Sequence, residues 1–150
     1  MHKPSILVPD YWQEAKDYLA SKDATLAALF ARYPDSVLQS RNDPFQTLAR
    51  AIVGQQVSVH AADAIWARLI TLIGQQAFIP ETVFLVDDIA LQSTGLSMQK
   101  RRYLRALAEF FLHEKIQGVG IWDGMADEEV IRHITQVKGI GRWSAEMFLI

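Results

Sequence analysis

The residues best suited to bind a charged group form a short turn near the end of the chain, with the sequence VKGIGRWSA at positions 137–145. Lys138 and Arg142 flank two glycines, Gly139 and Gly141. Glycine adopts backbone conformations closed to other residues, and the helix expected next begins with free N–H groups and the positive end of its dipole. The turn is therefore suited to hold an anion such as phosphate. Taken alone, a Gly-x-Gly turn of this kind is more typical of a plain connection between two helices.

A second glycine-led turn precedes the most basic stretch of the chain. Gly95 and Ser97 lead into a helix, and residues 95–115 contain five lysines and arginines against two acidic residues. Lys100 and its neighbours therefore either face phosphate or form the solvated side of an amphipathic helix. Charge alone does not decide between these interpretations, and the net charge of −2 argues against a protein that coats nucleic acid.

Two adjacent glutamines, Gln55 and Gln56, fall between two expected helices. Asp43 and the proline after it predict the start of a helix over residues 45–55, and Ser58 is a typical N-cap of the next helix. The glutamines then belong to a short polar loop. Without further information, this loop reads as an exposed helix end followed by an ordinary cap.

The elements that position these three segments are all predicted to be helices, because helical spacing and helix caps recur along the chain and no convincing strand pattern appears. Asp88, in the acidic pair 87–88, is expected to cap a short helix that ends at residue 93. The last helix ends on four apolar residues without a stop signal, so we expect one all-α domain over residues 1–150 that is incomplete at its C-terminus, with a hairpin motif at about 128–150. The expected helices cover residues 11–20, 24–33, 45–55, 59–73, a short segment from 80, 88–93, 98–114, 127–136 and 143–150.

Composition excludes several kinds of site and location. The 150 residues contain no cysteine, which excludes zinc thiolate sites, iron–sulfur ligation and disulfides within them. The longest apolar runs are far shorter than the ~20 residues needed to cross a bilayer, and residues 1–10 do not resemble a signal peptide, so we expect a cytoplasmic protein that binds no membrane. The histidines at 60, 113 and 133 show no spacing typical of a catalytic or metal site.

Three blocks in order resemble the helix-hairpin-helix DNA glycosylase superfamily, in its 3-methyladenine DNA glycosylase II branch. They are DPFQTLARAIVGQQVS at 43–58, GLSMQK at 95–100 and VKGIGRWSA at 137–145. The resemblance covers roughly residue 10 to the end of the chain. It implies a helix-hairpin-helix glycosylase fold and base excision repair of duplex DNA, in which the enzyme flips a damaged nucleotide out of the stack.

The resemblance also implies roles for individual residues. Gln56, in the loop that also contains Gln55 and Ser58, corresponds to the wedge that fills the gap left by the flipped base. The residues that correspond to phosphate contacts are Ser97, Lys100, Lys138, Gly139, Gly141 and Arg142.

Trp143 bears on the type of reaction. Relatives that also cut the DNA strand carry at this position a lysine that forms a Schiff base with the sugar. An indole cannot do so, but it can stack on a flipped alkylated base. We therefore expect a monofunctional enzyme with Trp143 in the base pocket, although a tryptophan also commonly packs in a core.

No catalytic carboxylate is expected within the chain, because the aspartate of the family lies beyond the second hairpin helix and therefore beyond Ile150. No cofactor is expected to be required. Members of the family often hold a structural monovalent cation in the hairpin, and the corresponding backbone carbonyls here belong to Thr135, Val137 and Ile140.

The sequence thus predicts a monomeric glycosylase that removes alkylated purines of the 3-methyladenine type from duplex DNA. If the protein is bacterial, it is expected to associate with the nucleoid. Two alternatives stay open at this point: a non-catalytic DNA-binding module that uses the hairpin only for phosphate contact, and a helical interaction domain that binds no nucleic acid.

Overall fold

A computed structural model of the chain describes residues 8–37 and 43–149. Helices form all of the regular structure in these two ranges, and neither range contains a strand, which confirms the all-α prediction. The chain divides into two compact units, residues 1–42 and 43–150. The single domain expected over residues 1–150 stays a prediction.

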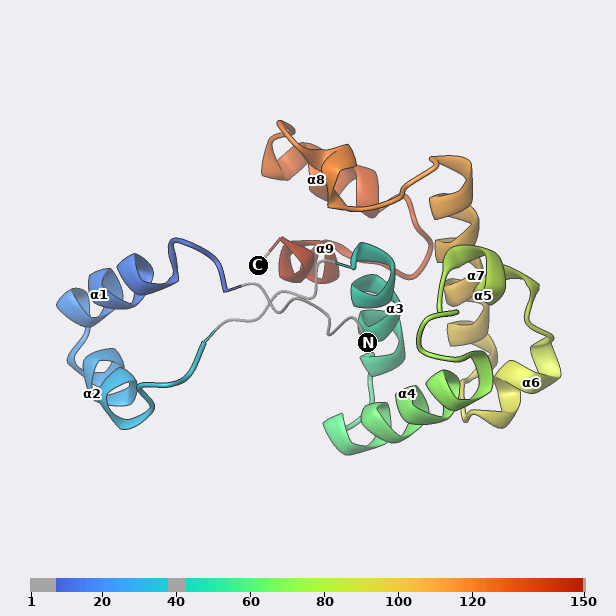
Figure 1. Cartoon of the computed structure of the whole chain (residues 1–150), viewed down its shortest axis with the longest axis horizontal. Coiled ribbons are helices and arrows are strands. Elements are labelled where there is room, and N and C mark those ends of the chain that lie inside the picture. Colours follow the sequence, from blue (N-terminus) through green and yellow to red (C-terminus); the bar gives the residue numbers. More distant parts are fainter. Residues whose placement is uncertain (1–7, 38–42, 150) are drawn as a thin grey trace. The chain divides into compact units, whose positions relative to one another are not determined.

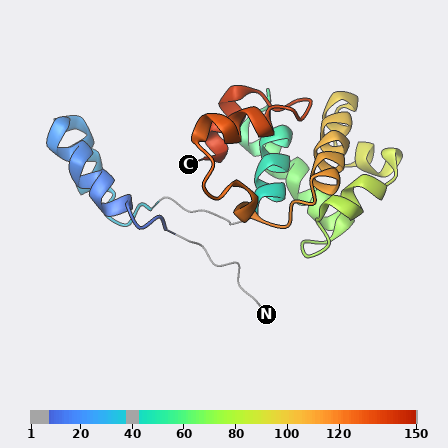
Figure 2. The same ribbon diagram turned by 90° about the horizontal axis from the view of Figure 1, so that it is seen from above.

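The first unit is a pair of helices, α1 (Trp12–Lys22) and α2 (Ala24–Arg32), which pack against each other (Figure 2). Asp23 separates them and caps α2 by accepting hydrogen bonds from two backbone amides. The Trp12 indole donates to the carbonyl of Ser36, 3.3 Å away, and so joins the start of α1 to the segment after α2. Neither helix contains a buried residue.

The second unit surrounds helix α3. Leu48, Ala49, Ile52 and Val53 of this helix are at most 1% exposed, and α3 contacts α4, α7 and α9 (Figure 1). The unit consists of α3 (Pro44–Gly54), α4 (Val59–Ile73), α5 (Pro80–Leu85), α6 (Asp88–Ser93), α7 (Met98–His113), the 3-10 helix η1 (Val119–Trp122), α8 (Asp127–Ile134) and α9 (Arg142–Phe148).

Most of the predicted helix starts are confirmed by their caps. The carboxylate of Asp43 accepts from the amide of Gln46 at 2.9 Å, and the hydroxyls of Ser58 and Ser97 each accept an amide in the first turn of α4 and α7. The prediction for α6 was wrong by one residue. Asp87 is its N-cap, because its side chain accepts from the amides of the second and third residues after it, whereas Asp88 is already helical.

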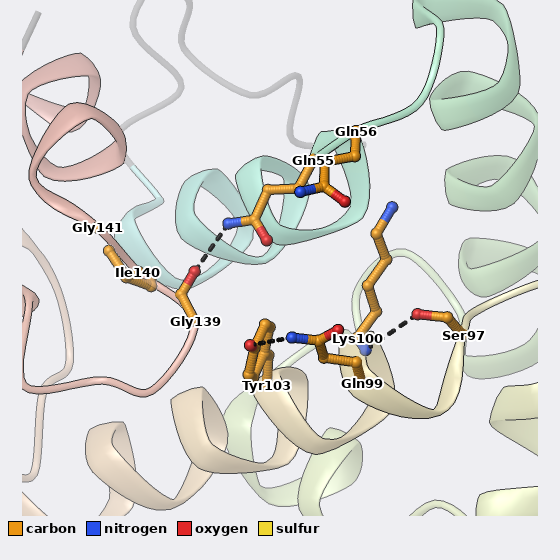
Figure 3. A pocket seen from close by; sticks show the side chains of 9 residues that line it. All are labelled: Gln55, Gln56, Ser97, Gln99, Lys100, Tyr103, Gly139, Ile140 and Gly141. Carbon is orange, nitrogen blue, oxygen red and sulfur yellow. Dashed lines mark hydrogen bonds between the residues drawn. The ribbon is translucent and has the colours of Figure 1, made fainter.

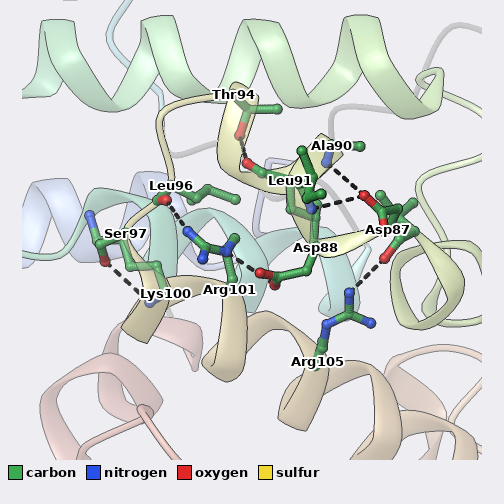
Figure 4. A network of polar contacts seen from close by, with 12 residues as sticks. Asp87, Asp88, Ala90, Leu91, Thr94, Leu96, Ser97, Lys100, Arg101 and Arg105 are labelled. Carbon is green, nitrogen blue, oxygen red and sulfur yellow. Dashed lines mark hydrogen bonds and ion pairs between the residues drawn. The ribbon is translucent and has the colours of Figure 1, made fainter.

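Asp88 instead takes part in a polar network that joins α6 and α5 to α7 (Figure 4). Arg101 donates to its carboxylate at 3.1 Å and to the carbonyl of Leu96 at 3.0 Å, and the arginine is only 8% exposed. Arg105 donates to two carbonyls, Phe84 and Val86. The basic side of α7 is therefore not simply a solvated face, because these two arginines attach the helix to its neighbours.

The C-terminal helix buries some of its apolar residues and exposes others. Phe148 packs edge-on against Trp122, with ring centroids 5.2 Å apart, while Met147 is 48% exposed. Ile150 and residues 1–7 lie outside the described part of the chain. A search of the described helices found none long and apolar enough to span a membrane.

Candidate nucleic-acid interface

Three segments that are far apart in the sequence line one pocket in the second unit (Figure 3). The loop after α3, the start of α7 and the turn between α8 and α9 surround a volume of about 430 Å³. The lining residues are Gln55, Gln56, Ser97, Gln99, Lys100, Tyr103, Gly139, Ile140 and Gly141. The structure thus brings together the three blocks that the sequence singled out.

The turn between α8 and α9 has the geometry of a close backbone approach. Gly139 has a φ of +98°, and a Cβ added to it would overlap the ring of Tyr103. Ile140 is buried and its amide donates to the carbonyl of Val137 at 3.0 Å, so the apolar residue between the glycines anchors the turn in the core. Only glycine satisfies both the backbone conformation and the space at position 139.

The predicted wedge loop is joined to this turn by one hydrogen bond. The side-chain amide of Gln55 donates to the carbonyl of Gly139 at 2.7 Å, across 84 residues of sequence. Gln56 is exposed and has a φ of +55°, an uncommon value for a residue with a side chain. Ser58 is exposed and caps α4. The two glutamines therefore differ: the side chain of Gln55 is hydrogen-bonded to the hairpin turn, whereas that of Gln56 is exposed.

The start of α7 provides the third side of the pocket. Ser97 caps the helix through its hydroxyl, and the ammonium group of Lys100 donates to the carbonyl of Val53 at 2.7 Å. Burial lowers the pKa of Lys100 from its ordinary value. This lysine is therefore held at the last turn of α3, where a cation also interacts favourably with the helix dipole.

Arg142 lies at the first position of α9 and is held by two carboxylates. Its guanidinium donates to both oxygens of Glu128 from α8, and its Nε donates to Glu146 at 2.7 Å. The ion pair lowers the pKa of Glu128 and raises that of Arg142. All three side chains are exposed, so Arg142 links the two hairpin helices at a surface where solvent or an anion can compete with the carboxylates.

The remaining predicted contacts of the hairpin face solvent. Lys138 is exposed, and Trp143 is 71% exposed. The alternative in which Trp143 packs in the core is therefore wrong for the described residues. An exposed indole beside a glycine turn is available to stack on a flat, apolar or cationic group.

The backbone of the hairpin turn is compatible with the expected monovalent cation. The carbonyls of Thr135 and Ile140 receive no hydrogen bond from the described residues, and that of Val137 accepts only the Ile140 amide. Neutral carbonyl oxygens suit a hard cation. The described residues contain no cluster of histidine and carboxylate side chains that could hold a metal ion instead.

Two pocket residues, Gln99 and Tyr103, were not among the predicted site residues. The amide of Gln99 donates to the hydroxyl of Tyr103, whose ring lies under Gly139. Helical spacing offered a signal, because Tyr103 follows Gln99 by four residues and Lys100 by three and so shares a face with both.

The histidines follow the sequence prediction. The indole Nε1 of Trp122 donates to Nδ1 of His133 at 2.9 Å, a structural contact, and His113 and His60 are exposed. No carboxylate lines the pocket within residues 8–37 and 43–149.

Comparison with known proteins reveals several relatives. DNA-3-methyladenine glycosylase 1 of Schizosaccharomyces pombe is 32% identical over 126 residues, which cover 83% of this chain and 55% of the relative. DNA-3-methyladenine glycosylase of Saccharomyces cerevisiae is 41% identical over 118 residues, covering 72% of this chain and 39% of the relative. The chain thus spans about half the length, or less, of these two relatives.

Solved structures resemble the chain over most of its length. A Schizosaccharomyces pombe 3-methyladenine DNA glycosylase in complex with abasic DNA has a TM-score of 0.78 at 29% identity, covering 91% of this chain and 68% of that one. A Bacillus halodurans DNA-3-methyladenine glycosidase has a TM-score of 0.69 at 35% identity, covering 78% and 54%. The model of the HhH-GPD superfamily of base excision DNA repair proteins matches residues 49–148. This chain belongs to that superfamily.

Proposed function

We propose that this chain is the DNA-binding part of a monofunctional DNA glycosylase that removes alkylated purines from duplex DNA. The observation that carries the proposal is the convergence of the loop after α3, the start of α7 and the glycine turn on one pocket. Two relatives named as 3-methyladenine glycosylases support the substrate class, and a structural neighbour holds abasic DNA.

Each segment has a role in this proposal. The amides of Gly139 and Gly141, with Lys138, bind a phosphate at the turn, and Ser97 and Lys100 approach the backbone from α7. Arg142 reaches the same phosphate when the anion displaces Glu128. Gln56 enters the duplex and fills the gap left by the flipped nucleotide, whose unstacking costs a few kcal/mol.

Trp143 accounts for the preference for alkylated purines. Its exposed indole stacks on the flipped base, and the positive charge of an alkylated purine strengthens that contact with the π face. An indole cannot form a Schiff base, so the enzyme hydrolyses the glycosidic bond and leaves the strand intact. The carboxylate that assists water is not among the described residues that line the pocket. A monovalent cation bound to carbonyls of the turn would be structural.

The protein acts as a monomer where chromosomal DNA is found. In a bacterium that place is the cytoplasm, in association with the nucleoid.

To test this proposal, the protein as encoded by its gene is incubated with duplex DNA containing 3-methyladenine. We expect release of the free base, strand breaks only after alkali, and no covalent complex on borohydride treatment. Absence of base release would contradict glycosylase activity, and strand cleavage without alkali would contradict the monofunctional assignment.

A non-catalytic DNA-binding module is the second candidate. It is favoured by the lack of a carboxylate among the described residues that line the pocket. A protein of this kind would bind duplex DNA with an affinity that falls as salt rises, and it would release no base. Binding that does not respond to salt would contradict both candidates and favour a helical interaction domain.

A further inference from the structure

Two hydrogen bonds to other parts of the unit hold the chain where α3 ends and the next loop begins. In the last turn of α3, the carbonyl of Val53 accepts from Lys100 of α7 at 2.7 Å. Two residues later, Gln55 donates to the carbonyl of Gly139 at 2.7 Å. Gln56 follows directly, with a φ of +55° and an exposed side chain. The position of Gln56 is therefore defined by two hydrogen bonds in which Gln56 takes no part.

The carbonyl that receives the Gln55 amide has little freedom to move. Gly139 lies in a left-handed conformation against the ring of Tyr103, with no room for a side chain. The Tyr103 hydroxyl accepts from Gln99, and Ile140, the next residue after the acceptor, is buried. A hydrogen bond to this carbonyl consequently relates the loop to a rigid part of the hairpin turn rather than to a flexible one.

The contact with Gln55 and the proposed phosphate contact involve different backbone groups of the hairpin turn. The carbonyl of Gly139 faces Gln55, while the phosphate-binding role proposed above uses N–H groups. One short turn can thus hold the DNA backbone and the loop that carries Gln56 at the same time.

We propose that Gln55 is a positioning residue that couples the hairpin turn to the loop carrying Gln56, so that phosphate binding places Gln56 at the gap in the duplex. The proposal rests on the function proposed above. Gln55 touches neither the phosphate nor the flipped base. Its loss leaves the phosphate contacts in place and removes the preference for DNA with a gap in its stack.

The test compares the binding of two duplexes by the whole protein. One duplex contains a tetrahydrofuran abasic analogue opposite 2-aminopurine, and the other is undamaged. Gln55→Met removes the donor and keeps a side chain of similar length. Gln55→His keeps an N–H group the same number of bonds from Cβ. Gln75→Met is a matched control, because the Gln75 amide donates to another glutamine on an exposed surface away from the pocket.

For Gln55→Met we expect unchanged affinity for undamaged DNA and a preference for the abasic duplex that falls about tenfold, with most of the 2-aminopurine fluorescence change lost. Gln55→His should restore both readouts, and Gln75→Met should behave as wild type. Should Gln55→Met fail to fold in a thermal melt, Gln55→Asn takes its place, because its amide is one methylene too short to reach Gly139.

If Gln55→Met, which lacks the donor, prefers the abasic duplex as strongly as the wild type does, the inference is overturned. An equal loss of affinity for both duplexes that Gln55→His does not reverse would also overturn it, since that result indicates a purely structural residue. A wild-type protein that shows neither base release nor preference for the abasic duplex would overturn the proposed function itself.

Discussion

The two glycine-led basic turns differ in how their positively charged side chains are held. At the start of α7, Lys100, Arg101 and Arg105 all donate to backbone carbonyls of neighbouring segments. In the hairpin turn, Lys138 is exposed and Arg142 is paired only with exposed carboxylates. A cluster of positive charge is therefore not by itself a DNA contact. The cations that hold the protein together are those whose charge is already satisfied by carbonyls.

The largest expected effect is that of Gly139→Ala. The substitution places a Cβ against the Tyr103 ring at a residue with a φ of +98°, and we expect it to lower the free energy of unfolding by about 3 kcal/mol. Urea denaturation followed by circular dichroism measures this. Gly141→Ser is the matched control in the same turn, with an ordinary φ and open space, and should change stability by about 0.5 kcal/mol or less. Equal effects at the two glycines would contradict the close packing at position 139.

Next in size is the contrast between Arg101 and its neighbour Arg102 on α7. Arg101→Met removes hydrogen bonds from a buried guanidinium to Asp88 and Leu96, which should lower the free energy of unfolding by about 2 kcal/mol. Arg102 is exposed, and Arg102→Met should have almost no effect. Equal stability of the two variants in urea would contradict the structural role given to Arg101.

Lys138 and Lys100 provide the test on the DNA side. Lys138→Met should weaken binding to undamaged duplex about fivefold and reduce the slope of log affinity against log salt by about 1, with no loss of stability. Lys100→Met should change the slope less and lower stability by about 1 kcal/mol, because its ammonium group donates to a carbonyl. Fluorescence anisotropy at several salt concentrations measures both slopes. If Lys100→Met changed the salt slope more than Lys138→Met does, the start of α7 rather than the hairpin turn would provide the stronger phosphate contact.

Glu128→Gln should strengthen DNA binding. The carboxylate holds Arg142 and repels phosphate, so its neutralisation should raise affinity for duplex DNA about threefold at low salt and make the salt dependence steeper. Glu129→Gln, on the same helix turn, is the control that removes one charge without releasing Arg142. An unchanged affinity for Glu128→Gln would mean that Arg142 takes no part in phosphate binding.

The smallest effect concerns pH. Arg142 lowers the pKa of Glu128 below its usual value of 4.5, so the ion pair stabilises the folded chain above that pH. This contribution is lost as the pH falls from 4.5 through the lower pKa of the folded state. The melting temperature of the wild type should therefore decrease more than that of Glu128→Gln between pH 5 and pH 3. Parallel curves would show that the exposed pair adds no stability.

The helices could be predicted because their starts and ends depend on neighbouring residues. Asp43, Ser58 and Ser97 each satisfy amides within their own first helical turn, a contact that needs no tertiary structure. The error at Asp88 also concerned a local contact, since the cap of α6 is one residue earlier than predicted. Two adjacent aspartates are equally good caps by type, and only the structure shows that Asp87 caps the helix while Asp88 contacts Arg101, 13 residues away.

The candidate site was predicted in its parts and not in its connections. The glycine turn, the loop with Gln56 and the start of α7 were all recognised by residue type and order. The role of Gln55 as a donor to Gly139 and the place of Tyr103 beneath that glycine were not, because each contact joins segments separated by dozens of residues.

The amino-acid sequence by itself determined the all-α fold, the helix caps and the residues able to bind an anion, because these follow from local backbone chemistry. Only the tertiary structure decided which cations remain available. Arg101 and Lys138 both carry a positive charge, but packing buries one beside a carbonyl and a carboxylate and leaves the other in water. The types of the two residues do not reveal this difference, because it depends on what packs around each side chain in the folded chain.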